Sequence, residues 1–167
     1  MEKAILVAID ETTNELLQTI ALFNDEQFNR IPFEGSWTAG QVAEHIYKSE
    51  YGIPMVWQSR GVPAGRPADE KAATIRSIFL DFTIKMQSPG FILPTDEPKE
   101  QAVLYDTIKI NRDSIASLAG SIDLNTLFPD IPFPQIGELT GLEWATFLVC
   151  HSKRHTRQLK NIYEYVK

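Results

Sequence analysis

Three histidines are the residues of this chain whose type and spacing best suit metal chemistry. His151 and His155 are four residues apart, and His45 lies far earlier in the sequence. On a helix, side chains four residues apart share one face, roughly 6 Å apart at Cβ, so both imidazoles can reach one ion. If the segment around His45 packs against that helix, the third ring can join them. Three protein ligands leave positions open for water or substrate, which is the pattern of a catalytic zinc site.

A second interpretation of the same histidines is purely structural. Histidines on the apolar face of a helix are often core residues that hydrogen-bond to neighbouring groups. Each buried imidazole then needs a partner of its own, because an unpaired buried polar group costs roughly 1–3 kcal/mol. The spacing alone leaves both interpretations open.

Two reactive side chains stand next to the histidines in sequence. Cys150 precedes His151, and Glu44 precedes His45. Adjacent residues on a helix point about 100° apart, so neither side chain easily faces the ion that its neighbour binds. We therefore predict that Cys150 is a buried, inert thiol and that Glu44 points away from the metal.

Other candidates have simpler explanations. Trp37 and Trp144 are interpreted as helix-start and core residues rather than a platform for substrate. Lys153, Arg154 and Arg157 lie beside the histidine pair and are interpreted as a solvated helix face, with a contact to an anionic substrate as the less favoured alternative. No catalytic acid or base is identified.

Two capping boxes mark the helices that must position the histidines. In each, a Thr caps the helix and a Gln or Glu three residues later reaches back. Thr38 and Gln41 predict a helix that continues to about Gln58, with a kink near Gly52. Thr140 and Glu143 predict a helix that runs almost to the last residue.

The remaining segments predict two more long helices and no sheet. Apolar residues with helical spacing run over residues 2–27 and again over 98–118. The long connection at 60–97 is expected to hold an extra helix at 69–87. The Pro-rich stretch 128–134 is expected to be a loop. Four long amphipathic helices predict an all-α helix bundle.

Length, charge and cysteine content indicate a single domain and argue against several classes of protein. The 167 residues predict a single domain spanning 1–167. The net charge of −6 argues against nucleic-acid binding, which needs a basic surface. No apolar run is long enough to span a membrane, and Cys150 alone cannot form an internal disulfide. A cytoplasmic location is the expectation.

Two motifs give the chain a resemblance to the DinB/YfiT-like superfamily. The first is Trp37-Thr38-x-x-Gln41-x-x-x-His45. The second joins Gly137-Glu138-Leu139-Thr140-x-x-Glu143-Trp144 to His151-x-x-x-His155-x-x-Gln158-Leu159. The resemblance implies a four-helix bundle with up-down-down-up connections. It also implies that His45, His151 and His155 bind a divalent metal, with nickel and zinc the expected ions.

The resemblance leaves several activities open. Members of the family include thiol-dependent S-transferases, a thiol-dependent isomerase and hydrolases. The first expectation is a thiol-dependent S-transferase that acts on a small electrophilic substrate, with a low-molecular-weight thiol as its partner. The alternatives are a metal-dependent hydrolase of small amides or esters, and a non-catalytic metal- or ligand-binding stress-response protein. No nucleic-acid or membrane partner is expected, and a homodimer is left open.

Overall fold

The computed structural model describes residues 2–167, which are mostly helical. The four long helices are α1 (Glu2–Ile20), α3 (Ala39–Glu50), α6 (Gln101–Ala119) and α7 (Gly141–Val166). The shorter ones are α2 (Asp25–Asn29), α4 (Ile53–Gln58), α5 (Ala72–Phe79) and the 3-10 turn η1 (Gly90–Ile92). The strands are β1 (Val62–Pro63), β2 (Thr126–Phe133) and β3 (Gly137–Thr140).

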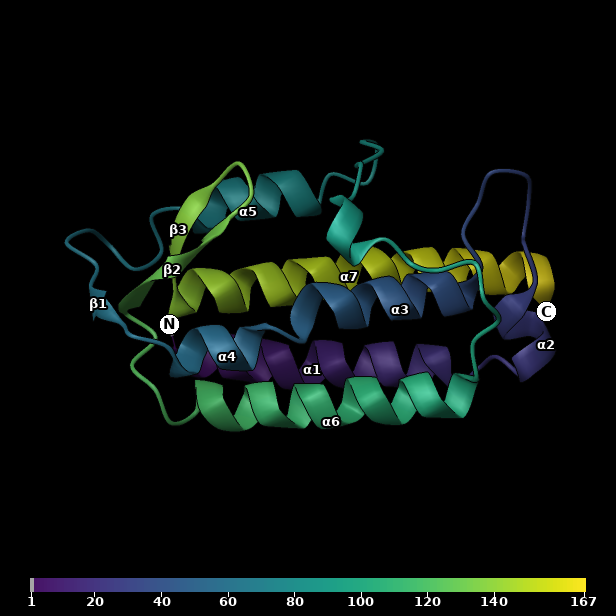
Figure 1. The fold of residues 1–167 in the computed structure, drawn as a ribbon, viewed down its shortest axis with the longest axis horizontal. Coiled ribbons are helices and arrows are strands. Elements are labelled where there is room, and N and C mark those ends of the chain that lie inside the picture. The colour runs from purple at the N-terminus through teal and green to yellow at the C-terminus, as the bar shows by residue number, and fades with distance from the viewer. Residues whose placement is uncertain (1) are drawn as a thin grey trace.

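The four long helices lie side by side along the length of the molecule (Figure 1). Both α1 and α3 pack against α6 and α7. The colours in Figure 1 show that α1 and α7 run in one direction, whereas α3 and α6 run in the other. Helix α5 lies on the outside of α7, next to the strands. None of the described helices is long and apolar enough to cross a lipid bilayer.

Both predicted capping boxes are present. The Thr38 side chain accepts a hydrogen bond from the Gln41 N–H at the start of α3. The Thr140 side chain does the same for Glu143 at the start of α7. The predicted kink also occurs, because α3 ends at Glu50 and α4 begins at Ile53.

A three-stranded sheet contradicts the expectation of no sheet. The strand order is β1-β2-β3, and both pairs are antiparallel. Residues 128–133 of the Pro-rich stretch belong to β2 rather than to a loop, and Pro134 follows the strand. Its prolines are tolerated because the register of β2 and β3 is irregular between Phe128 and Phe133, where Pro129 and Pro132 lie. Prolines in sheets are confined to such irregularities and to edges.

The first predicted helix is broken in two. We predicted one helix over residues 2–27, but α1 ends at Ile20 and α2 begins at Asp25. The break arises from a third capping box, in which Asn24 accepts from the Gln27 N–H and the Gln27 side chain accepts from the Asn24 N–H.

The extra helix is shorter than predicted. It spans residues 72–79 instead of 69–87. The Asp81 carboxylate accepts hydrogen bonds from the N–H and hydroxyl of Thr83, which turns the chain away from helical geometry. The third long helix, predicted from residue 98, begins at Gln101.

The apolar core consists of two clusters with buried polar side chains between them. Successive helical residues fall into different clusters, as in the pairs Ile46 on α3 and Ile53 on α4, Ile108 and Ile115 on α6, and Leu159 and Leu148 on α7. Between the members of each pair lie Glu50, Arg112 and Ser152 respectively, all fully buried. His151 and His155 lie at the same level of α7. We call Glu50, Arg112, His151, Ser152 and His155 the polar layer.

Candidate metal centre

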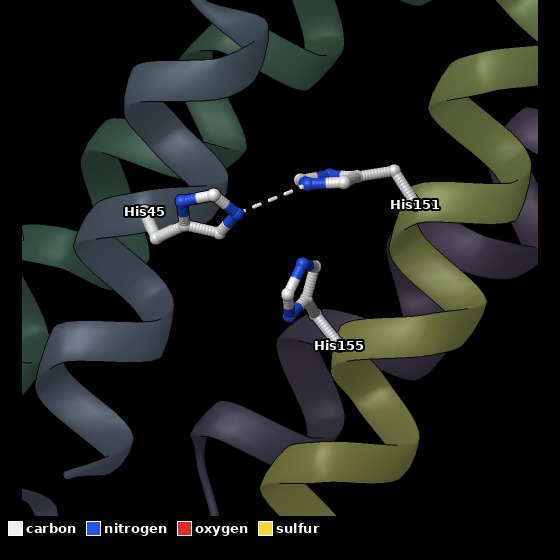
Figure 2. Close-up of side chains that lie close together, drawn as sticks. All are labelled: His45, His151 and His155. Carbon is white, nitrogen blue, oxygen red and sulfur yellow. Dashed lines mark hydrogen bonds between the residues drawn. The ribbon is translucent and has the colours of Figure 1, made fainter. Parts of the chain in front are cut away.

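The three predicted ligands come together in the core. His45 on α3 faces His151 and His155 on α7, and the three rings point toward one another (Figure 2). One nitrogen from each ring can be chosen so that all three lie within 4.8 Å of one another. The residues are only 3%, 3% and 8% exposed, respectively. Spacing and sequence motif therefore identified side chains that form one buried cluster.

Each ring has a hydrogen-bond partner at its Nδ1 atom. His45 Nδ1 lies 3.0 Å from the carbonyl oxygen of Ile92. His151 Nδ1 lies 3.1 Å from Glu50 Oε1, and His155 Nδ1 lies 2.8 Å from Gln158 Oε1. All three partner atoms are oxygens that accept, so each Nδ1 carries the proton.

The proton at Nδ1 leaves the Nε2 lone pair of each ring free. The Nε2 atoms of His45 and His151 lie 3.3 Å apart with no proton left to share between them. Lone pairs at this separation repel unless a cation lies between them. Ligand nitrogens about 2.0–2.1 Å from one tetrahedral ion stand about 3.3 Å apart. The donor set therefore fits a divalent metal ion.

Burial keeps the rings neutral, as metal ligands must be. It lowers the pKa of His45, against the opposing effects of the Ile92 carbonyl and the Glu50 charge. It lowers the pKa of His151 and His155 well below the usual histidine value, and neighbouring positive groups add to the shift. The cluster thus offers three neutral imidazoles at neutral pH, each with one nitrogen free of a proton.

A buried ion pair between Glu50 and Arg112 lies on the Nδ1 side of the His151 ring. Arg112 donates from Nε to Glu50 Oε2 and from Nη2 to Glu50 Oε1, both at 2.8 Å. Arg112 Nη2 also donates to Ser152 Oγ at 2.6 Å. Burial raises the pKa of Glu50 to about 7, although the Arg112 charge opposes the shift. Because both Glu50 oxygens accept from a guanidinium that can only donate, the geometry is that of the ionised carboxylate.

Aromatic side chains surround the cluster. The ring centroid of Trp37 lies 5.2 Å from that of His45. The Phe147 and Phe79 ring centroids lie 5.0 Å and 6.1 Å from that of His151. Trp37 also packs against the core cluster of α3, as its predicted role at the helix start requires. These rings reduce the local polarity and so strengthen electrostatic interactions at the site.

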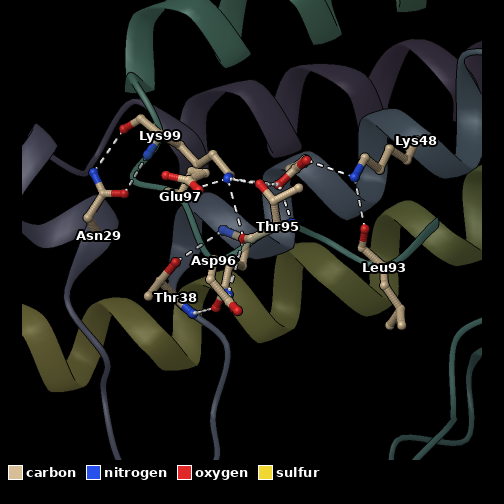
Figure 3. A network of polar contacts seen from close by, with 10 residues as sticks. Asn29, Thr38, Lys48, Leu93, Thr95, Asp96, Glu97 and Lys99 are labelled. Atoms are coloured by element: carbon tan, nitrogen blue, oxygen red, sulfur yellow. Dashed lines mark hydrogen bonds and ion pairs between the residues drawn. The ribbon is translucent and has the colours of Figure 1, made fainter. Parts of the chain in front are cut away.

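The segment between α5 and α6 covers the cluster and is anchored to α3. This α5–α6 segment (residues 80–100) supplies the Ile92 carbonyl to His45. Lys48 donates to the Leu93 carbonyl at 2.8 Å, and the Thr95 N–H donates to Glu44 at 2.9 Å (Figure 3). Glu44 therefore points away from the histidines, as predicted, and holds the segment that positions one of them.

Charged neighbours set the ionisation of Glu44. Burial raises its pKa, but hydrogen bonds from Lys48, the Thr95 backbone and Lys99 outweigh that effect and lower the pKa to about 2. Gln41 joins the same network, since its side chain donates to the Thr95 carbonyl at 3.4 Å and to Asp96 at 3.3 Å. The hydrogen bonds of Gln41 thus serve both the helix cap and the α5–α6 segment.

Arg154 corrects the prediction of a solvated face. Its guanidinium donates to the carbonyl oxygens of Asp81 at 2.8 Å and Phe79 at 3.3 Å, and also to that of Ile84. These carbonyls accept no hydrogen bond within a helix, because α5 has ended. The long, positively charged side chain of Arg154 on α7 reaches them instead. Arg157 is exposed and lies over the Phe82 ring, and Lys153 is exposed as expected.

The remaining candidates lie away from the rings. Cys150 is buried in the apolar core, and burial raises the pKa of its thiol. Among the described residues, it is not part of the cluster that could hold a metal. Trp144 is a core residue. Glu143 caps α7 and pairs with Arg66 through two contacts of 2.7 Å.

Sequence reasoning missed Glu50 and Arg112. A signal for both was available, because each takes a position at which the helical pattern demands an apolar residue. Glu50 lies between Ile46 and Ile53, and Arg112 lies four residues after Ile108. A charged residue at such a position is buried only with a partner.

Comparisons with known proteins found a family profile and a curated relative that each match most of the chain. A family profile described as DinB superfamily matches residues 8–159. The chain is 24% identical over 157 residues to the uncharacterized protein YuaE of Bacillus subtilis (strain 168), covering 94% of this chain and 93% of YuaE. No solved structure matches the chain significantly.

Proposed function

Because the chain belongs to the DinB superfamily, we propose that it is a divalent-metal-dependent enzyme whose ligands are His45, His151 and His155. The observation that carries this proposal is the convergence of three Nε2 lone pairs, each fixed by a partner at Nδ1. Zinc and nickel are the ions proposed, because imidazole ligands suit both.

We further propose that the reaction is thiol-dependent S-transfer to a small electrophilic substrate. When bound, a divalent ion supplies positive charge that lowers the pKa of a thiol or water at an open position. In the transfer, the thiol sulfur bonds to the electrophilic carbon, the leaving group departs with its electron pair, and the thiol proton passes to solvent. The aromatic side chains of Trp37, Phe79 and Phe147 suit an apolar substrate.

Hydrolysis is the second candidate. Attack by water benefits from a general base close to the reacting atoms. Among the described residues, the one carboxylate hydrogen-bonded to a ring of the cluster is Glu50, and both of its oxygens are already held by Arg112. A thiol depends less on such a base, because its ordinary pKa, about 8.5 for cysteine, already lies far below that of water, and this favours S-transfer. The third candidate is a non-catalytic metal- or ligand-binding stress-response protein.

The architecture proposed with this function is one domain over residues 1–167. In chain order, α1 and α7 run in one direction, and α3 and α6 run in the other. These directions, and the packing of the four helices, support the up-down-down-up four-helix bundle. The polar layer crosses three of these helices, so the site needs the bundle as a unit. We also propose a cytoplasmic location, because the chain has a single cysteine.

A thiol-conjugation assay tests the proposed function. Protein loaded with Zn²⁺ or Ni²⁺ is incubated with monochlorobimane and either glutathione or cysteine, and the fluorescent conjugate is measured. We expect metal-dependent conjugation that is lost in His155→Ala. Thiol-independent cleavage of p-nitrophenyl acetate would instead support the hydrolase. Stoichiometric metal without either activity would support the non-catalytic protein.

A further inference from the structure

We propose that Glu50 is a positioning residue, which holds His151 in the Nδ1–H tautomer and so aims its Nε2 lone pair at the metal. The inference rests on the proposed metal site. Glu50 does not touch the ion, since its oxygens already face Arg112 and His151 Nδ1. It acts through the ring that it holds.

Glu50 acts only as an acceptor in its hydrogen bonds to Arg112 and His151. A guanidinium has no acceptor atom, so Arg112 donates to both carboxylate oxygens. Glu50 Oε1 can then only accept from His151 Nδ1, 3.1 Å away. The proton of the ring is thereby fixed at Nδ1. Ser152 extends the chain, because it accepts from Arg112 and donates to the Leu148 carbonyl at 2.7 Å.

Stability does not explain this ion pair. Glu50 and Arg112 are each 1% exposed, and burying two charges brings a desolvation penalty that can exceed their attraction. Apolar residues of similar size often stabilise such a position equally well or better. The pair interrupts the apolar core at the level of the histidines, where a carboxylate behind a ligand raises the basicity of that ligand.

The chain also contains a matched control. Glu143 is a second fully buried glutamate that pairs with an arginine through two hydrogen bonds. It lies on α7, the helix of His151, but it hydrogen-bonds to Arg66 and backbone N–H groups rather than to an imidazole. Substituting either glutamate breaks the ion pair of a buried carboxylate, but only Glu50→Gln disturbs a proposed ligand.

The first experiment measures Zn²⁺ affinity by competition with a chromophoric chelator. We expect Glu50→Gln to weaken Zn²⁺ binding roughly 10–100-fold. Glu143→Gln should leave the affinity within about threefold of the wild type, although both variants lose thermal stability. Equal losses of affinity in the two variants, or no loss in Glu50→Gln, would overturn the proposal.

A double variant separates positioning from folding. Replacing Glu50→Leu together with Arg112→Met removes the ion pair without leaving a buried charge unpaired. We expect this variant to unfold at a temperature close to that of the wild type and yet to bind Zn²⁺ at least tenfold more weakly. Wild-type affinity in a folded double variant would show that Glu50 has no positioning role.

The tautomer of His151 tests the inference without metal. Long-range ¹H–¹⁵N spectra of the metal-free protein should show the Nδ1–H tautomer for His151 in the wild type and a shift toward the Nε2–H form in the double variant. An unchanged tautomer would contradict the role of Glu50 even if zinc binds. If the wild type takes up no zinc, the metal proposal fails separately, and the spectra still decide the role of Glu50.

Discussion

At the scale of single residues, each proposed ligand is oriented by a different kind of acceptor. His45 uses a backbone carbonyl from the α5–α6 segment, His151 uses a carboxylate, and His155 uses the amide of Gln158 one turn away. The three rings are thus fixed by three independent parts of the chain. A loss of one acceptor should disturb one ring and leave the other two in place.

Cys150 provides a residue-scale prediction. The thiol is buried in the apolar core next to His151 in sequence, but it is not part of the histidine cluster. Cys150→Ala should leave the zinc content unchanged and lower the free energy of unfolding by about 1 kcal/mol, because it leaves a small cavity. Elemental analysis and urea unfolding check both values. Loss of zinc from a folded Cys150→Ala variant would place sulfur among the ligands.

The sequence predicts the three clustered histidines better than the groups that support them. His151 and His155 share a helical face at any packing, so their pairing follows from local spacing. The acceptors of His45 and His151 lie 47 and 101 residues away in sequence, so they depend on tertiary packing. Only Gln158 is local to its ring. Glu50 and Arg112 could have been noticed in the sequence, because each is a charged residue at a position where the helical pattern calls for an apolar one.

At the scale of elements, close backbone contact fixes the start of α7. A Cβ at Gly141 would lie 3.0 Å from the Leu124 Cα atom and 3.2 Å from the Leu124 carbonyl oxygen. The N–H of Leu142 donates to that same carbonyl at 2.8 Å. The register of the helix that carries two of the proposed ligands is therefore tied to the chain just before β2.

Two glycine substitutions test this contact. Gly141→Ala should lower the free energy of unfolding by about 1–3 kcal/mol, because backbone atoms must move to admit the methyl group. Gly120→Ala is the control, since its Cβ would meet nothing closer than 3.7 Å. It should be neutral or stabilise by about 0.4–1 kcal/mol. Chemical denaturation of both variants gives the comparison, and equal effects would contradict the account.

The anchoring of the α5–α6 segment should depend on pH through Glu44. The pKa of Glu44 is about 2 in the folded protein, against an ordinary value of 4.5. A lowered folded-state pKa contributes stability above pH 4.5, and this contribution is lost as the pH falls from 4.5 toward 2. Glu44→Gln should therefore cost about 1–3 kcal/mol at pH 7, and the cost should shrink across that window.

Urea unfolding of the wild type and Glu44→Gln at pH 7, 4.5 and 3 measures this dependence. Glu15→Gln is a suitable control, because Glu15 forms an exposed pair with Lys160 of the kind that contributes about 0–1 kcal/mol. A difference between wild type and Glu44→Gln that stays constant over the three pH values would show that the segment is not held by this charge.

Element boundaries were predictable where the cap is local. Thr38 and Thr140 marked two helix starts correctly, because a capping box is encoded within four residues. Asn24 forms the same device with Gln27, and it was overlooked inside a continuous apolar pattern. The strands could not be found in this way, since the irregular pairing that accommodates the prolines of β2 depends on β3.

At the scale of the whole molecule, the polar layer divides the apolar core and is held by several helices at once. Glu50, Arg112 and the histidine pair come from α3, α6 and α7. Binding of an ion at this level should tie α3 to α7 in the folded state alone, because the unfolded chain does not bring the rings together. Metal binding and folding should therefore be linked.

Removal of metal tests this linkage. At a free zinc concentration one hundred times its dissociation constant, binding stabilises the folded state by about 2.7 kcal/mol. For a chain of this size, that corresponds to roughly 5–10 °C in melting temperature. Calorimetry with Zn²⁺ and with a chelator should show this difference, whereas His45→Ala should melt at the same temperature in both. An equal melting temperature for the wild type with and without zinc would contradict the linkage.

The zinc content of purified protein tests the central claim most directly. After dialysis against micromolar Zn²⁺ and then against metal-free buffer, elemental analysis should find about one zinc ion per wild-type chain. His151→Ala should retain little zinc while its far-UV spectrum stays helical, because the apolar clusters on either side of the polar layer still pack. A wild-type chain without zinc, or a His151→Ala variant that keeps a full equivalent, would contradict the account.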